Sequence, residues 1–234
     1  MLFMGVLLGL TSSLARTRDS NVNSPRSKRD GSTPVIIPAQ MTSVGATDTR
    51  FALAENQAWE LAEEFGTPLY VLDESHLRSR ARAWKAAWPH GDLSFASKAN
   101  STLAVLRIMA SEGLSIDVAS EGELRAALRA GVPAHQCRLH GNNKTWEEVS
   151  FAAAVGVGKA IVDNFQELEL WQEANASLPL LLRLAPGVDP KTNAKISTGQ
   201  ADTKFGFPIA DGQAMEALRL AIESGLNIVG FHCH

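Results

Sequence analysis

The sequence predicts an α/β protein, a (β/α)8 TIM-type barrel truncated after about six strands. One observation is an alternation of short apolar runs with amphipathic helical segments, in which the first four runs of the repeat begin about 20 residues apart, as a strand, a helix and two short loops require. A second observation is that each apolar run ends in polar or charged residues. A doubly wound open sheet is the competing architecture.

The chain starts with an extension that shows no periodic pattern. Residues 1–10 are apolar but too short to span a bilayer, and residues 11–50 are rich in Ser, Thr, Asn, Arg and Pro. We expect residues 1–50 to be a disordered or targeting-like extension and residues 51–234 to be the barrel domain. The arginines leave an organellar transit peptide open, although we expect a cytoplasmic protein. A net charge of −3 favours neither a nucleic acid nor a membrane as partner.

Periodicity and breakers predict the elements in order. A helix closed by Gly66 precedes a strand at 69–73 and a basic helix at 75–88. The repeating strand–helix units follow. Their strands are predicted at 93–100, 115–120, 137–143, 159–164, 178–187 and 227–234, with a long loop at 188–210.

Lys98 is the centre of the predicted site. It lies at the carboxyl end of its strand, before an expected helix N-cap pair, Asn100-Ser101. Ligands bind at that end of the strands in α/β barrels, and a lysine amine there suits Schiff-base chemistry. The alternative is a strand-capping lysine that points into water.

Every other strand also delivers polar groups to the same rim. In a barrel these groups converge on one mouth, whereas in an open sheet only two or three meet. They are Asp117, Ser120, His140, Asn142, Asp163, Asn164, Arg183, His232 and His234.

Plainer roles for several rim residues stay open. Asp117 can cap backbone amides, and Arg183 can pair with either Asp117 or Asp163. Glu123 suits a favourable charge at a helix N-terminus better than a catalytic role. His232 and His234 share a strand face, as metal ligands can, but no carboxylate follows at ligand spacing, so we expect no metal.

Five motifs together resemble the diaminopimelate decarboxylases. These are ASKAN, GLSIDVASEGEL, RLHGNNK, STGQADTKFGF and GFHCH. That family belongs to the fold-type III pyridoxal-phosphate enzymes, together with ornithine and arginine decarboxylases and alanine racemase. The resemblance implies the alanine racemase-like barrel, pyridoxal 5'-phosphate as cofactor, and decarboxylation of meso-diaminopimelate to L-lysine. It also implies a small amino-acid substrate and a homodimer when the protein is full length.

The resemblance assigns four residues. Lys98 matches the lysine that binds the cofactor covalently, and Asp117 matches the acid close to it. Arg183 matches an arginine beneath the cofactor, and His234 matches the histidine that stacks on the pyridine ring. His140 and Asn142 match pocket-lining positions.

Three alternative functions stay open. The first is another fold-type III decarboxylase that acts on ornithine, arginine or lysine, and the second is a non-catalytic pyridoxal-phosphate-binding homologue. A third is a Schiff-base aldolase that uses Lys98 without cofactor. The loop at 191–199 lacks the histidines often found there in the family.

We also expect the chain to be part of a longer protein. Six strands do not close an eight-stranded barrel, and the family's carboxyl-terminal β-domain has no counterpart in the sequence. The strand at 69–73, which joins that domain in the family, should therefore lack a partner. For the same reasons we expect the 234 residues alone to be inactive.

Overall fold

A computed structural model describes residues 35–37, 53–174, 177–187 and 205–234 of the protein. The chain divides into two units, Met1–Ala87 and Trp88–His234. Most of the first 50 residues, which were predicted to be a disordered or targeting-like extension, lie outside the described residues. The loop motif STGQ also lies outside them. The domain boundary expected at residue 50 therefore stays a prediction.

The first unit contains a strand pair that the sequence did not predict. Its elements are β1 (Val35–Ile37), α1 (Glu55–Phe65), β2 (Val71–Asp73) and α2 (Glu74–Ala87). Strand β2 was expected to lack a partner, and this is wrong, because β1 pairs with it in parallel. Asp73 then starts α2 by accepting hydrogen bonds from the Ser75 hydroxyl at 2.7 Å and the His76 amide at 3.1 Å.

The second unit repeats the strand–helix pattern. It comprises β3 (Ser94–Ala96), a 3₁₀ turn η3 (Ser97–Ala99), α3 (Leu103–Ser111), β4 (Ser115–Val118), α4 (Glu121–Arg129), η4 (Ala134–Gln136), β5 (Cys137–Leu139), α5 (Trp146–Val155), β6 (Lys159–Val162), α6 (Phe165–Glu173), β7 (Leu180–Ala185), β8 (Phe207–Pro208), α7 (Gln213–Glu223) and β9 (Ile228–Cys233). All six strands predicted for this region are present. The two-residue strand β8 lies where only a loop was expected.

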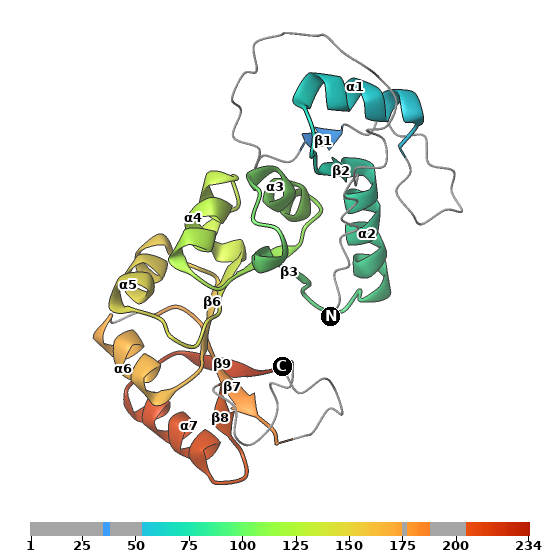
Figure 1. The fold of residues 1–234 in the computed structure, drawn as a ribbon. Helices are drawn as coiled ribbons and strands as arrows, with labels where there is room; N and C mark the ends of the chain where they lie inside the picture. Colours follow the sequence, from blue (N-terminus) through green and yellow to red (C-terminus); the bar gives the residue numbers. More distant parts are fainter. Residues whose placement is uncertain (1–34, 38–52, 175–176, 188–204) are drawn as a thin grey trace. The chain divides into compact units, whose positions relative to one another are not determined.

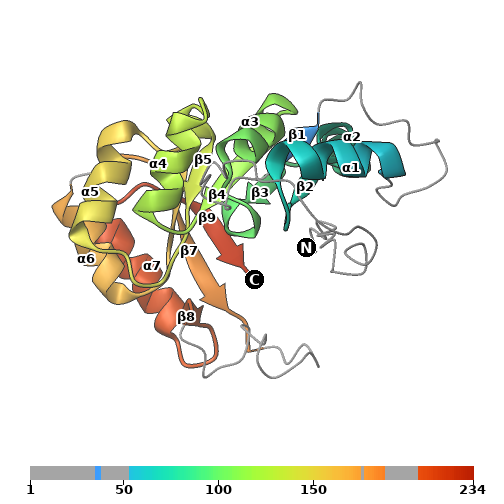
Figure 2. The same ribbon diagram turned by 45° about the horizontal axis from the view of Figure 1, so that its top comes forward.

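The strand order identifies a barrel architecture. The strands are parallel and follow one another in the order β3-β4-β5-β6-β7-β8, while β9 pairs with β7. Helices α3 to α7 form one curved row along one side of the strands (Figures 1 and 2). A doubly wound sheet reverses its strand order and carries helices on both faces. The described part of the chain is therefore a partial (β/α) barrel, whose sheet does not close among these residues.

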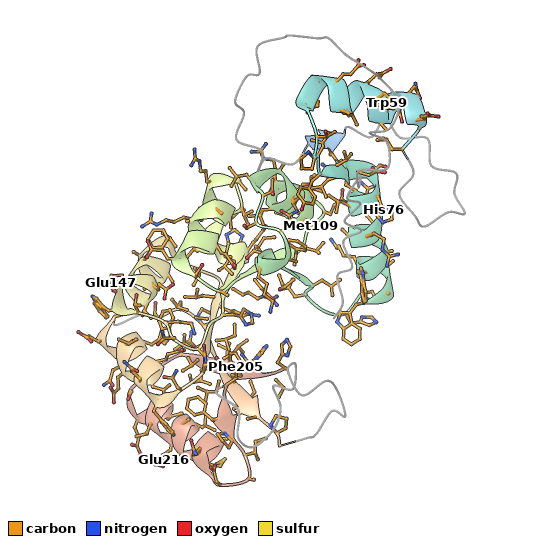
Figure 3. All side chains as sticks on the ribbon, in the orientation of Figure 1. Trp59, His76, Met109, Glu147, Phe205 and Glu216 are labelled. Carbon is orange, nitrogen blue, oxygen red and sulfur yellow. The ribbon has the colours of Figure 1, made fainter. Side chains whose placement is uncertain are left out.

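The core lies between the strands and this row of helices. Met109 of α3 is among the packed side chains, whereas Glu147 and Glu216 lie on the outer side of their helices (Figure 3). The fully buried residues come from both layers, and they include Leu106, Met109, Ile116, Leu124, Leu139, Ile161, Trp171, Leu180, Leu182 and Phe207. Their exclusion from water is the main force that holds helices to strands.

The segment around Lys98 differs from the prediction. Strand β3 ends at Ala96, and Lys98 lies in the following 3₁₀ turn. Helix α3 begins at Leu103 with Thr102 as its N-cap, so the expected Asn100-Ser101 cap is wrong. The Asn100 side-chain oxygen instead accepts a hydrogen bond from the Thr102 amide at 3.0 Å. Such local bonds compete with helix, which delays the helix start.

Alanine substitutions at two glycines, one tightly packed and one with open space, test the packing of the second unit. A Cβ built on Gly158 would lie 2.0 Å from the carbonyl oxygen of His135, whereas at Gly122 the nearest atom would be 3.8 Å away. We expect Gly158→Ala to lower the free energy of unfolding by about 1–3 kcal/mol through overpacking. Gly122→Ala, the control, should leave stability unchanged or raise it by up to about 1 kcal/mol. Urea unfolding monitored by circular dichroism measures the stability of both variants. Equal unfolding midpoints would contradict the close packing of Gly158 against the His135 carbonyl.

Candidate active site

The turns at the carboxyl ends of β4, β5 and β6 share one local design. A polar N-cap residue starts the next helix, and its side chain accepts a hydrogen bond from the backbone amide of a glutamate three residues later. The pairs are Ser120 and Glu123 at 3.2 Å, Thr145 and Glu148 at 3.3 Å, and Asn164 and Glu167 at 3.0 Å. Ser120 and Asn164, predicted as rim groups, therefore have a structural role as helix caps.

Each of these glutamates also contacts the turn of the preceding unit. We call Glu123, Glu148 and Glu167 the bridging glutamates. Their carboxylates accept hydrogen bonds from the Ser97 hydroxyl at 2.5 Å, the Glu121 amide at 3.1 Å and the Lys144 ammonium at 2.7 Å, respectively. The four turns after β3, β4, β5 and β6 are thereby joined in series. This series of contacts was not predicted from the sequence, although a cap residue followed three positions later by a glutamate is a known capping signal.

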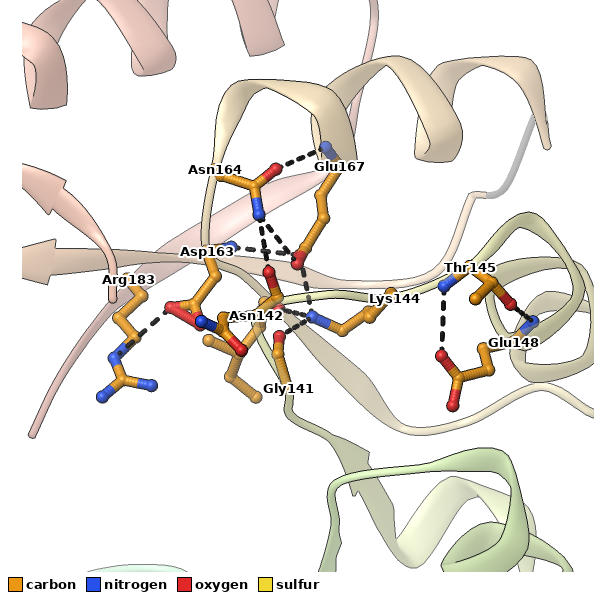
Figure 4. Close-up of polar contacts among 10 residues, drawn as sticks. Gly141, Asn142, Lys144, Thr145, Glu148, Asp163, Asn164, Glu167 and Arg183 are labelled. Carbon is orange, nitrogen blue, oxygen red and sulfur yellow. Dashed lines mark hydrogen bonds and ion pairs between the residues drawn. The ribbon is translucent and has the colours of Figure 1, made fainter. Parts of the chain in front are cut away.

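Lys144 is the most deeply buried link in this series. Its side chain is 2% exposed, and its ammonium donates to the carbonyls of Gly141 and Ile161 at 2.5 and 2.7 Å as well as to Glu167 (Figure 4). Glu167 also accepts the Asp163 amide at 3.1 Å. Burial raises the pKa of Glu167 against the opposing effect of Lys144. This ion pair fixes the ends of β5 and β6 to one another.

Asp163 is the partner of Arg183, which decides between the two pairings left open by the sequence. The Arg183 Nε lies 3.4 Å from Asp163 Oδ1, and the Asp163 side chain is 1% exposed. The guanidinium also lies over the Phe205 ring, 4.5 Å from its centroid. Gly206 has φ +76°, and a Cβ there would come within 2.8 Å of the Arg183 carbonyl oxygen. Arg183 is thus held from several directions.

Asp163 itself is poorly compensated for its burial. Neither of its carboxylate oxygens has a hydrogen bond of good geometry within the described residues. Burial raises its pKa, and Arg183, Lys144 and the backbone amide of Gly206 only partly oppose this effect. A buried, charged carboxylate with so little compensation lowers the stability of the fold. Groups with a strongly shifted pKa are typical of functional sites.

Three histidines and Asp117 form a row near Arg183. His140 Nε2 lies 3.6 Å from Asp117 Oδ1, and its ring packs edge-on against His232 with centroids 5.3 Å apart. The His232 and His234 centroids are 6.5 Å apart. Burial, assisted by the charges of His140 and Arg183, lowers the pKa of His232 to about 4, so its imidazole is neutral at pH 7.

His234 connects this row to Lys98. Its pKa is lowered by burial first, and then by the positive charges of Arg183 and Lys98. Lys98 itself is exposed, and its amine has no hydrogen-bond partner among the residues that the structure describes. The charge of Lys98 is therefore within electrostatic range of His234, at one end of the histidine row. Among the described residues no group of three or more His, Cys, Asp and Glu side chains is arranged to hold a metal ion.

Residues 74–234 match the family model described as pyridoxal-dependent decarboxylase, pyridoxal binding domain. The chain belongs to this family. Among its relatives is the diaminopimelate decarboxylase of Actinosynnema pretiosum, 48% identical over 179 residues, which are 76% of this chain and 41% of that protein. The diaminopimelate decarboxylase of Bacillus subtilis is 43% identical over 183 residues, 74% of this chain and 42% of its own length.

Solved structures agree with this membership. The diaminopimelate decarboxylase of M. jannaschii in complex with L-lysine has a TM-score of 0.68 and 36% identity, covering 83% of this chain and 48% of that one. The lysine/ornithine decarboxylase of Vibrio vulnificus with putrescine has a TM-score of 0.65 and 30% identity, covering 78% and 47%. The chain thus spans less than half the length of these relatives. The structural similarity confirms the barrel fold predicted from the sequence.

The family's cofactor is pyridoxal phosphate, and the residues at this rim fit it. A cofactor with an aldehyde, a ring nitrogen, a phenolic oxygen and a phosphate needs an amine and several polar contacts. Lys98 supplies an exposed amine that has no hydrogen bond within the described residues. Asp117 Oδ1 and His232 Nδ1 are buried polar atoms that lack a hydrogen-bond partner within the described residues, and Arg183 adds a positive charge. Unsatisfied polar atoms at the edge of a site are typical of a place where a ligand completes the contacts.

The burial of Asp163 gives a test with a defined sign. A raised carboxyl pKa means that the folded state disfavours the charged form, so the wild type loses stability as the pH rises from the ordinary value through the raised one. We expect Asp163→Asn to be more stable than the wild type at pH 7, by about 1.4 kcal/mol for each pKa unit of the shift. The gain should vanish below about pH 3, where the wild-type carboxyl is protonated in both states.

Urea unfolding of both proteins from pH 3 to pH 8 measures this difference. Asp211→Asn, on an exposed loop, is the control and should show no comparable gain. A wild type that is more stable than Asp163→Asn at pH 7 would show that the Arg183 pair outweighs desolvation.

Proposed function

We propose that the full-length protein decarboxylates meso-diaminopimelate to L-lysine and carbon dioxide with pyridoxal phosphate bound to Lys98. The observation that carries the proposal is the exposed Lys98 amine just after β3, which has no hydrogen bond among the described residues and whose charge acts on His234. The same rim carries buried atoms of Asp117 and His232 that lack hydrogen bonds within the described residues. Relatives at 41–48% identity that carry the name diaminopimelate decarboxylase support the substrate. Solved diaminopimelate decarboxylases are 28–36% identical to this chain and solved lysine and lysine/ornithine decarboxylases are 27–30% identical, so the support for the substrate comes from the curated relatives.

In this proposal each residue acts on the cofactor or its surroundings. When bound, pyridoxal phosphate withdraws the electron pair that remains on the substrate after carbon dioxide leaves. Lys98 would hold the cofactor covalently through its side-chain amine. His234, whose lowered pKa keeps it neutral at pH 7, offers an uncharged ring for stacking. Asp117 and Arg183 place one negative and one positive charge at the rim, and Asp163 orients Arg183.

A homodimer and a cytoplasmic location complete the proposal. The homodimer rests on the resemblance of the five motifs to the family, and the cytoplasmic location is the expectation drawn from the sequence. No helix among the described residues is long and apolar enough to cross a membrane.

Reductive trapping tests the assignment of Lys98. After incubation with pyridoxal phosphate, borohydride should fix the cofactor to the tryptic peptide that contains Lys98, as measured by mass spectrometry. Lys98→Ala should abolish this label, because no other amine occupies the position. Lys85→Ala, which removes an exposed lysine of α2, is the matched control and should label as the wild type does. A covalent cofactor retained by Lys98→Ala would disprove the assignment.

A substrate panel tests the reaction. Carbon dioxide release by the full-length protein should be fastest with meso-diaminopimelate and accompanied by L-lysine. Because a site built to pair a substrate's polar group rejects analogues that lack it by up to about 10⁴–10⁵-fold, ornithine, arginine and lysine should be poor substrates. Preference for one of those three would establish the rival decarboxylase. Cofactor binding without turnover of any of the four would favour the non-catalytic homologue.

A further inference from the structure

We propose that Glu123 is a positioning residue for Lys98 and acts through the hydroxyl of Ser97. The inference rests on the proposed function, in which Lys98 carries the cofactor. It assigns to Glu123 a purpose beyond that of a favourable charge at the start of α4.

The contact joins the Lys98 turn to the adjacent strand end. Ser97 Oγ donates to Glu123 Oε2 at 2.5 Å, and Ser97 is fully buried. The same carboxylate oxygen accepts the backbone amide of Ala119 at 2.8 Å. Ala119 directly follows β4, the strand that carries Asp117. One carboxylate therefore fixes the spacing between the turn of Lys98 and the strand of Asp117, through hydrogen bonds of the strong, charge-assisted kind.

The Lys98 turn has few other anchors. It is a single 3₁₀ turn of three residues, and its N-cap, Ala96, has no side chain that can cap it. Ser97 is the buried member of the turn, whereas Lys98 and Ala99 are exposed. Within the described residues, the hydroxyl of Ser97 makes the side-chain hydrogen bond that ties the turn to another element. Loss of this bond should let the backbone of Lys98 move.

The geometry of Glu123 also differs from an ordinary capping glutamate. In a capping box, the glutamate at the third helical position accepts the backbone amide of the N-cap residue, as Glu148 does from Thr145 at 3.1 Å. Glu123 occupies the same helical position but accepts from Ala119, one residue before the N-cap Ser120, and from Ser97. Its carboxylate is thus directed toward the Lys98 turn.

Glu148 supplies a matched control. Like Glu123 it lies in the first turn of its helix, pairs with an N-cap side chain and contacts the preceding unit, where it accepts the Glu121 amide. Among the described residues, Glu148 has no hydrogen bond to the turn of Lys98. A general loss of helix capping therefore affects both variants, and a loss of positioning affects only Glu123.

The experiment compares Glu123→Ala, Glu123→Gln, Ser97→Ala and Glu148→Ala in the full-length protein. The first readout is the rate at which added pyridoxal phosphate becomes fixable by borohydride on the Lys98 peptide, measured from pH 6 to pH 9. The second is hydrogen exchange of the peptide spanning 97–100 in the cofactor-free protein. Urea unfolding identifies any variant that does not fold.

We expect Glu123→Ala and Ser97→Ala to slow labelling of Lys98 by about tenfold or more at every pH, since displacement of a reacting group by 1 Å can cost about 10²-fold. Exchange at 97–100 should speed up in the same two variants. Glu123→Gln should recover most of the rate, because its amide oxygen accepts the same two hydrogen bonds. Glu148→Ala should lower stability by about 0.5–2 kcal/mol, as a lost cap does, with labelling and exchange at Lys98 unchanged.

Wild-type labelling and exchange in a folded Glu123→Ala or Ser97→Ala would overturn the inference, as would equal slowing in Glu148→Ala. If the wild type itself is labelled on a lysine other than Lys98, the proposed function fails first. The exchange readout needs no cofactor, so it separates the two failures.

Discussion

Helices that follow parallel strands leave backbone amides without partners at every turn, and this constraint shapes the carboxyl-end rim. The first amides of a helix have no acceptor within the helix, and strand ends add more. The bridging glutamates Glu123, Glu148 and Glu167 satisfy several of these amides. Because each carboxylate also contacts the preceding turn, the requirement of local hydrogen bonding becomes a connection between neighbouring strand–helix units.

Among the contacts made by the bridging glutamates, the Lys144–Glu167 ion pair is the most deeply buried. The Lys144–Glu167 pair is almost completely excluded from water, and its remaining bonding capacity is met by two carbonyls and a backbone amide. A buried pair of this kind adds little net stability over apolar packing, but removal of one partner leaves an unpaired charge in the interior. Its value lies in fixing one arrangement of the turns, on which the positions of Asp163 and Arg183 depend.

Other polar groups at the same rim are less well satisfied. Among the described residues, the buried carboxylate of Asp163 lacks a hydrogen bond of good geometry, and Asp117 and His232 each have a buried polar atom without a hydrogen bond. These groups lower stability in the absence of a ligand. A rigid series of turns beside an incompletely bonded row of side chains is an arrangement suited to a polar cofactor, since the ligand supplies the missing contacts and the turns hold its neighbours in place.

Local sequence patterns were sufficient to predict the alternation of strands and helices, the barrel class and the polar residues at the carboxyl ends of the strands. These follow from local periodicity and from the rule that parallel strands end at one edge. Local reasoning failed where two signals compete, as at Asn100, whose side-chain bond delays α3. It also failed for β2, whose partner β1 lies more than 30 residues earlier in the chain.

The pairing of the rim residues with one another depends on the folded arrangement of the units. Arg183 pairs with Asp163 rather than Asp117, Lys144 pairs with Glu167, and Glu123 contacts Ser97. Ser97 and Glu123 are 26 residues apart, and Lys144 and Glu167 are 23 apart. A side chain's type indicates that it needs a partner when buried, but the partner is chosen by strand register and by the approach of turns from successive units. The distances in space between such side chains are set by packing across the sheet, and no local pattern in the sequence encodes that packing.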